Sequence, residues 1–132
     1  MLEHLVKRIT KTIGGTDTAV LSTIGSLGLQ TGVFQCEYHD QMVLLLISTT
    51  LDILDNLLEG YEVSVTAVSW QLRGQAKVAS KKEIQNLRLA SHPDSSWNQV
   101  VQVTPSRIQL RPGNGWEFEE TIDFDSKGAK NE

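Results

Sequence analysis

Apolar residues recur at two different spacings along this 132-residue chain, and the change of spacing separates predicted helices from predicted strands. Near the N-terminus, from Leu2 to Ile13, they fall three or four residues apart, which predicts an amphipathic helix. The pair Gly14-Gly15 follows and is expected to end that helix in the left-handed conformation that glycine adopts cheaply. Further along, apolar residues alternate with polar ones or run together, which predicts strands. The predicted strands are 18–24, 29–38, 42–49, 61–69, 70–79 and 100–110.

Turn and cap residues separate these strands. Short turns are expected at 25–28 and at His39-Asp40. Thr49 with Asp52, and Ser80 with Glu83, have the spacing of helix capping boxes. They predict one helix over residues 51–58, stopped at Gly60, and another from Ser80 to about residue 90.

Three strands carry further information about their positions. Strand 42–49 is apolar on both faces, which is typical of a central strand. Gly74 lies inside a predicted strand and indicates a bend or the close approach of another group to the backbone. Pro105 is expected to kink the last long strand or to place it at an edge.

The order of elements predicts a mainly β fold with flanking helices. The first three strands are joined by short turns and should be antiparallel. Six short strands with helices at the connections indicate a small closed barrel, since a doubly wound sheet needs a helix after nearly every strand. The chain length fits one domain.

The charge is unevenly distributed. The net charge of −4 arises entirely in residues 114–132, where six acidic residues face Lys127 and Lys130. We therefore divide the chain into a barrel domain, 1–113, and an acidic C-terminal extension, 114–132, in which 116–124 is expected to add a short strand and the end to be partly disordered. The absence of a basic stripe argues against a nucleic-acid surface.

Composition also limits where the protein acts. No apolar run approaches the ~20 residues of a membrane helix, and the N-terminus lacks a secretory pattern, so no membrane association and a cytoplasmic location are expected.

A single cysteine, Cys36, excludes an internal disulfide and is expected to be a small buried apolar residue. His4, His39 and His92 are too scattered to predict a metal site. No nucleophile with a neighbouring base is visible, so catalytic residues stay unassigned.

Five segments, in this order and spacing, carry a resemblance to a known family. They are Ala19–Thr23 with the glycine turn after it, Leu44–Thr50, Asn56-Leu57 with Val63–Val65, Trp70–Val78 with its Gly-x-Ala-x-Val pattern, and Val101–Ile108. Together they resemble the pyridoxamine 5'-phosphate oxidase-like, flavin mononucleotide (FMN)-binding split-barrel family over residues 1 to about 111.

The resemblance implies a six-stranded antiparallel split barrel and a homodimer that holds FMN in a groove between the subunits. In that family the phosphate lies near the end of the third strand, which here is Ser48, Thr49 and Thr50. The further candidates for contact with the flavin are Trp70, Gln71, Arg73 and Trp116. Helix capping by the hydroxyl residues and simple packing of Trp70 are the alternative roles.

The sequence departs from the family pattern where the phosphate would bind. Flavin-binding members carry Lys or Arg about three residues before the Asn-Leu pair, where this chain has Ile53 with Asp52 beside it. The second strand, 29–38, also lacks a basic residue. The remaining basic candidates lie on other strands: Arg73, Lys77 and Arg107. We therefore expect FMN binding to be weak.

Two functions from different classes follow. The first is an FMN-binding protein, either an FMN-dependent oxidoreductase or a flavin carrier, whose substrate the sequence does not reveal. The second is a cofactor-free split barrel that has lost the phosphate site and serves as a ligand-binding or interaction module. A haem-binding barrel ranks below both, because no histidine is well placed for it.

Overall fold

The computed structural model describes residues 2–26, 28–39, 41–48, 51–86, 98–110, 120–125 and 128–129. Its helices are α1 (Leu2–Gly14), α2 (Ile53–Leu58) and α3 (Lys81–Asn86). Its strands are β1 (Thr18–Gly25), β2 (Gly28–His39), β3 (Met42–Ser48), β4 (Val63–Thr66), β5 (Trp70–Val78), β6 (Asn98–Leu110), β7 (Glu120–Asp125) and β8 (Gly128–Ala129).

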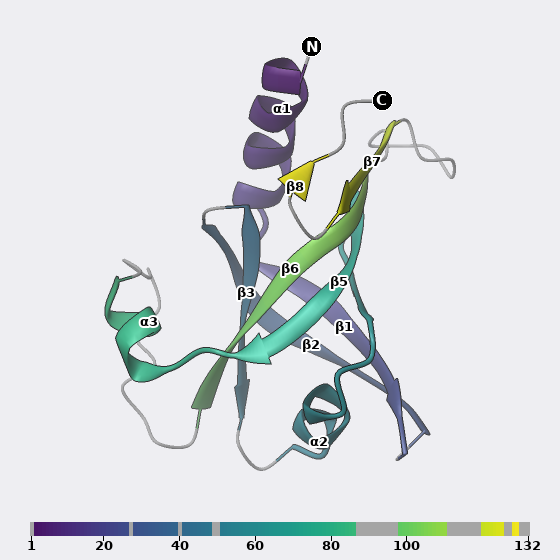
Figure 1. The fold of residues 1–132 in the computed structure, drawn as a ribbon, viewed down its shortest axis with the longest axis vertical. Coiled ribbons are helices and arrows are strands. Elements are labelled where there is room, and N and C mark those ends of the chain that lie inside the picture. Colours follow the sequence, from purple (N-terminus) through teal and green to yellow (C-terminus); the bar gives the residue numbers. More distant parts are fainter. Residues whose placement is uncertain are drawn as a thin grey trace.

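Six antiparallel strands close into a barrel. The sheet order is β3-β2-β1-β4-β5-β6, and β3 also pairs with β6, from Val43 opposite Val103 to Ser48 opposite Asn98. β3 therefore has a neighbour on each side, which agrees with the apolar residues on both of its faces. The predicted six-stranded antiparallel split barrel is confirmed (Figure 1).

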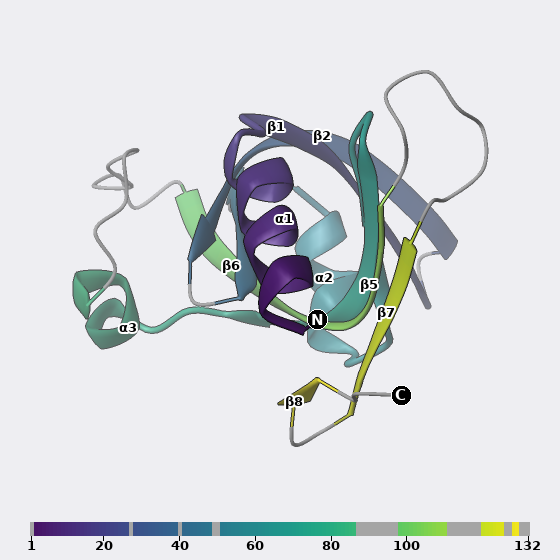
Figure 2. The same cartoon turned by 90° about the horizontal axis from the view of Figure 1, so that it is seen from above.

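Two helices lie at opposite ends of this barrel, as the two views of the ribbon show (Figures 1 and 2). α1 inserts Ile9 and Ile13 into the core, so its amphipathic pattern reflects one face buried against the strands. α2 contributes Ile53 and Leu57 at the other end. The described helices are all too short or too polar to cross a bilayer.

Among the described residues, the barrel interior is filled mainly by branched aliphatic side chains and by Trp70. Leu21, Val65, Leu72 and Trp70 are each fully buried. The Trp70 indole N–H donates to Thr16 Oγ1 at 2.9 Å, which satisfies the one polar atom of the ring.

Cys36 is the small buried side chain that the sequence predicted, with 6% exposure. Burial first, and then the nearby Asp17 and Glu37 carboxylates, together raise the pKa of its thiol to about 11. The thiol is therefore neutral at physiological pH, and any stability that it contributes is present below its ordinary pKa and lost as the pH rises through 11.

Several local predictions are wrong at their boundaries. Among the described glycines only Gly28 and Gly60 have positive φ, so the Gly14-Gly15 pair does not form a left-handed cap. Instead Thr16 closes α1, with its Oγ1 donating to the carbonyl of Thr12 at 3.1 Å. β2 runs through His39, so the turn does not begin there; Asp40, the other residue of the predicted turn, lies outside the described residues, and Gln41 has φ 65°.

The two predicted capping boxes have different outcomes. The box at Ser80 is confirmed: the Ser80 amide donates to Glu83 Oε1 at 3.0 Å, and the Glu83 amide donates to Ser80 Oγ at 3.2 Å. The backbone bond from Ser80 and the contact with Lys77 lower the pKa of Glu83 to about 2. At α2, Asp52 occupies the cap position without a side-chain cap hydrogen bond, and Thr49 lies outside the described residues.

Part of the acidic extension packs on the barrel domain. β7 pairs with the end of β6, and Ile122 is only 6% exposed within the core. Arg107 on β6 donates to Asp123 on β7 through Nε at 2.6 Å. β6 therefore pairs with β3 as far as Val103 and with β7 from Arg107 onward. Pro105 lies between these two stretches, where its missing N–H interrupts neither ladder.

At Gly74 the backbones of β5 and β6 approach each other closely, as the glycine within a strand predicted. It pairs with Pro105 at a register shift in the β5–β6 ladder. A Cβ on Gly74 would overlap the backbone carbonyl of Thr104. Only glycine fits at this crossing of the two strands.

We therefore predict that Gly74→Ala lowers the free energy of unfolding by about 1–3 kcal/mol or more, because backbone atoms must move to admit the methyl group. Chemical denaturation measures this change. Gly14→Ala is the matched control: a Cβ there meets nothing within 4 Å, and helix propensity favours alanine. Equal denaturation midpoints for Gly74→Ala and the unaltered protein would contradict the crossing described here.

Candidate functional site

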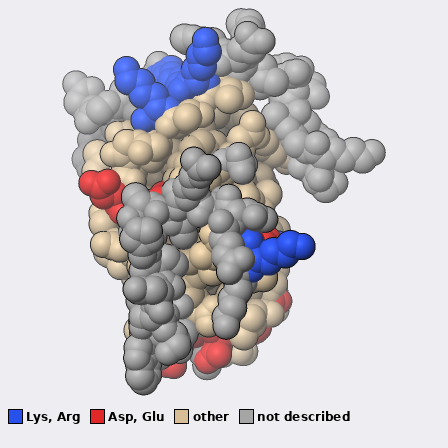
Figure 3. Space-filling view, turned by 90° about the vertical axis from the view of Figure 1, so that its left-hand side faces the viewer, with Lys and Arg blue, Asp and Glu red and all other residues tan. Residues whose placement is uncertain are grey.

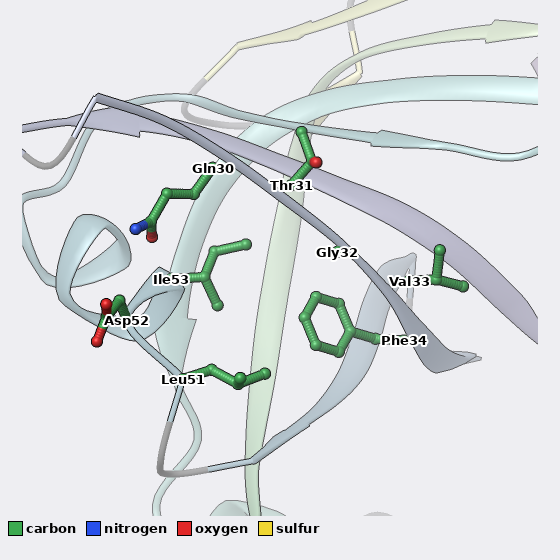
Figure 4. A pocket seen from close by; sticks show the side chains of 8 residues that line it. All are labelled: Gln30, Thr31, Gly32, Val33, Phe34, Leu51, Asp52 and Ile53. Atoms are coloured by element: carbon green, nitrogen blue, oxygen red, sulfur yellow. The ribbon is translucent and has the colours of Figure 1, made fainter.

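A groove of about 430 Å³ lies between β2 and the start of α2 (Figure 4). Its walls come from two segments that are far apart in the sequence, 30–34 and 51–53. The lining residues are Gln30, Thr31, Gly32, Val33, Phe34, Leu51, Asp52 and Ile53. The volume is in the range of small-molecule sites.

Alternation along β2 shapes one wall of the groove. Thr31 and Val33 are on the exposed face of the strand, whereas Gln30 and Phe34 are half-buried on the other. A Cβ on Gly32 would come within 2.7 Å of the Phe34 ring, so the glycine gives the ring room to lie against the strand. Phe34 and Ile53 face each other across the groove, as Figure 4 shows.

Gln30 contributes an unusual polar group to this wall. Its Oε1 is buried and has no hydrogen-bond partner among the described residues. Its side chain extends from β2 toward the start of α2 (Figure 4). A buried acceptor without a partner is costly, and a ligand that carries a hydrogen-bond donor can satisfy it.

The other wall is held in place by Asn56 and Glu59 of the α2 region. Asn56 Nδ2 donates to Thr23 Oγ1 at 3.1 Å and to the Gly28 carbonyl at 3.0 Å. The Glu59 carboxylate accepts from the amide and the hydroxyl of Ser26. These bonds join α2 to the β1–β2 hairpin, so the same hairpin that supplies one wall fixes the other.

Gly25 shows how closely α2 approaches the β1–β2 hairpin. A Cβ at this position would come within 2.5 Å of Asn56 Oδ1 and 2.9 Å of Glu59 Oε2. The hairpin turn therefore has to be glycine where α2 rests on it. The sequence marked the Asn56-Leu57 pair only through the family resemblance, and the structure gives the asparagine this structural role.

The residues expected to bind a cofactor are not all brought together. Ser48 ends β3 and its carbonyl accepts from the Leu51 amide at 3.2 Å, which places it just before the groove. Thr49, Thr50 and Trp116 lie outside the described residues. Trp70 is a fully buried core residue and presents no face to a ligand within the described part of the chain.

Gln71 and Arg73 lie away from the groove, on β5. Gln71 Nε2 donates to Ser64 Oγ at 3.3 Å. Arg73 is exposed and lines a second pocket of about 290 Å³, which includes Glu62 and Ser64. The two pockets share no residue among those described as lining them.

Ile53 is a core residue, not an open position beside a phosphate. It is only 5% exposed and packs in the main hydrophobic cluster, although one side of it lines the groove. The family pattern had suggested it as the place of a missing cation. The exposed positions at this wall are Leu51 and Asp52.

The three basic residues considered as alternative contacts for a phosphate either pair with acidic side chains or lie outside the groove. Lys77 Nζ lies 2.9 Å from Glu83 Oε2. Arg107 pairs with Asp123, and that hydrogen bond raises the pKa of the guanidinium. Arg73 belongs to the second pocket. None of the three lines the groove.

The fold was compared with known proteins. No family model matches the chain, and no curated protein matches it significantly. Among solved structures, General Stress Protein 26 from Bacillus anthracis superposes with a TM-score of 0.70 at 18% identity, over 87% of this chain and 97% of that one. A pyridoxamine 5'-phosphate oxidase-related, FMN-binding protein from Nostoc punctiforme gives 0.66 at 10% identity, over 99% and 95%. This chain has the pyridoxamine 5'-phosphate oxidase-like split-barrel fold.

The same split barrel occurs in proteins described by different ligands. A heme binding protein from Mycobacterium smegmatis matches with a TM-score of 0.68 at 16% identity, over 86% of this chain and 56% of that one. The resemblance drawn from the sequence is thus confirmed for the fold. The ligand has to be argued from the groove itself.

We predict that Asn56→Ala lowers the free energy of unfolding by about 1–3 kcal/mol, because it leaves Thr23 and the Gly28 carbonyl without their donor. Asn56→Asp should cost at least as much, since it removes the donor and places a charge beside Glu59. Denaturant titration measures both. Asp55→Asn, on the exposed face of the same helix, should stay within about 0.5 kcal/mol. If Asn56→Ala matches this control, Asn56 does not hold the wall.

Proposed function

We propose that this protein binds a flavin in the groove between β2 and α2 and acts as a flavin-dependent oxidoreductase or a flavin carrier. The observation that carries the proposal is the lining of the groove: an aromatic ring and aliphatic side chains on two facing walls, with a buried acceptor between them. Such a slot suits a planar heteroaromatic ring. The similarity of the fold to an FMN-binding protein supports the same choice.

We further propose that the working unit is a homodimer formed through one face of the barrel. The outward residues of β1 and β2 pair as Val20 with Val33 and Ile24 with Leu29, and these four are 37–71% exposed. The outward positions between and beside them on β1, β2 and β4 are uncharged: Thr18, Ser22, Thr31, Gln35, Ser64 and Thr66. Glu62 and Arg73 lie at the edge of this face, beside Ile24 and Leu29. A face of this kind is typical of an interface between copies.

The groove lies beside this apolar face. Thr31 and Val33 border the groove by their positions on β2, while their side chains point to the outer face, away from Phe34 and Ile53 (Figure 4). A second copy on the face would pack against the outer side of β2, the strand that carries Gln30 and Phe34, and so hold this wall of the groove in place.

The flavin, when bound, supplies the redox chemistry. The residues of this chain hold and orient it: Phe34, Leu51 and Ile53 contact the ring, and Gln30 accepts a hydrogen bond from it. The second candidate function is a cofactor-free ligand-binding module, favoured because none of the described lining residues is basic. His39 already contacts Glu37 at 2.9 Å, which gives no support to haem.

Gly32→Ala tests the groove. The added methyl group displaces the Phe34 ring into the space for the ligand, and we expect flavin affinity to fall about tenfold, or ~1.4 kcal/mol. Fluorescence titration with riboflavin measures the change, and a cooperative thermal transition shows that the variant is folded. Gly14→Ala, outside the groove, should bind as the unaltered protein does. Equal affinity for both variants would place the ligand elsewhere, and no binding by the unaltered protein would favour the cofactor-free module.

Val20→Glu tests the dimer. We expect the unaltered protein to sediment at about twice 14.7 kDa at micromolar concentration. A carboxylate in the middle of the apolar face should yield a folded monomer, because charges are excluded from interface cores. Leu58→Glu, at a 74% exposed position on α2, should remain a dimer. A monomeric unaltered protein would refute the proposal.

A further inference from the structure

The groove lies in a part of the chain that has no basic residue. Between Lys11 and Arg73 the sequence contains no Lys or Arg, and this stretch makes β1, β2, β3, β4 and α2. Both walls of the groove therefore come from segments without a positive charge. The same stretch contains Asp52, whose exposed carboxylate lines the groove.

Charge is also separated along the barrel. α1 carries Lys7, Arg8 and Lys11, whereas the α2 end carries Asp52, Asp55 and Glu59. In Figure 3 a group of Lys and Arg side chains lies at the top, the α1 end, and acidic side chains lie along the lower edge. The groove thus opens at the acidic end, where a dianionic phosphate is repelled.

Three backbone amides near α2 are not free to bind a phosphate. The Leu51 amide donates to Ser48, the Leu54 amide to Leu51 and the Asp55 amide to Asp52, at 2.9–3.2 Å. These donors are already used within the turn. α2 itself has only six residues, so few peptide dipoles add along its axis.

The rest of the lining fits a neutral ring. Phe34, Leu51 and Ile53 supply apolar surface, and the Gln30 Oε1, unpartnered within the described structure, requires a donor. An isoalloxazine ring carries an N–H group that can serve as this donor. The groove residues thus fit the ring of a flavin and do not fit its phosphate.

We propose that this groove selects the unphosphorylated flavin, riboflavin, over FMN. The proposal rests on the proposed flavin-binding function and specifies its ligand. Discrimination comes from Asp52 and from the lack of a cation among the described lining residues, while the ring contacts are common to both ligands. The protein would then hold riboflavin, or a ring compound like it, without a phosphate anchor.

Parallel titrations of the intact protein with riboflavin and FMN, followed by flavin fluorescence at low salt, test this directly. We expect riboflavin to bind at least tenfold more tightly. Asp52→Lys should raise FMN affinity about tenfold and change riboflavin affinity less than twofold. Asp55→Lys, on the same helix but outside the groove lining, should change the ratio of the two affinities clearly less than Asp52→Lys does. Raising the salt concentration from about 0.01 M to about 1 M should reduce the difference between the riboflavin and FMN affinities, because screening weakens the repulsion between Asp52 and the phosphate.

The outcomes separate the two proposals. Equal or tighter binding of FMN overturns the selectivity and leaves flavin binding in place. A preference for riboflavin that Asp52→Lys does not reduce overturns the role of Asp52. Binding of neither flavin overturns both the selectivity and the proposed function.

Discussion

The pairing of β3 with β6 closes the sheet, and the course of the remaining chain follows from that closure. Once β3 lies between β2 and β6, the chain that leaves Ser48 has no free place beside it. The next strand, β4, pairs with β1 and β5, on another side of the barrel. The connection must therefore cross the end of the barrel, and α2 is the segment that crosses. The groove exists because this crossing helix passes close to β2.

Asn56 and Glu59 fix the position of this crossing helix. A six-residue helix has little stability of its own, so its position depends on tertiary contacts. The two side chains bond to the β1–β2 hairpin through Thr23, Ser26 and the Gly28 carbonyl. At the other end of the barrel, α1 inserts its apolar face, and Trp70 bonds to the residue that closes α1. The ligand groove and the basic helix are consequently kept at opposite ends.

Features encoded over a few residues could be predicted from the sequence. The capping box of Ser80 and Glu83 depends on four consecutive residues, and the helix stop at Gly60 on one. Gly74 was informative because glycine weakens a strand unless the backbone bends there or another group approaches it closely. The number of barrel strands followed from alternation, and the barrel followed from their order.

Features that depend on distant neighbours could not be predicted in the same way. Gln30 and Phe34 carry no motif, and they become groove residues only because α2 crosses near β2. The position of Ile53 suggested a vacant cation site, but its side chain turns into the core. Trp70 was a candidate ligand contact, whereas its indole is buried and bonded to Thr16. The charge separation was present in the sequence, but its meaning required knowing which strands line the groove.

The central claim, that the crossing helix creates the site, is tested most directly by locating the bound ligand with an NMR titration. Amide chemical shifts of the protein, recorded during titration with riboflavin, should change most at residues 30–34 and 51–53, on both walls at once. Residues of the second pocket around Arg73 should change little. Shifts concentrated around Arg73, or confined to one wall, would contradict a site formed between β2 and α2.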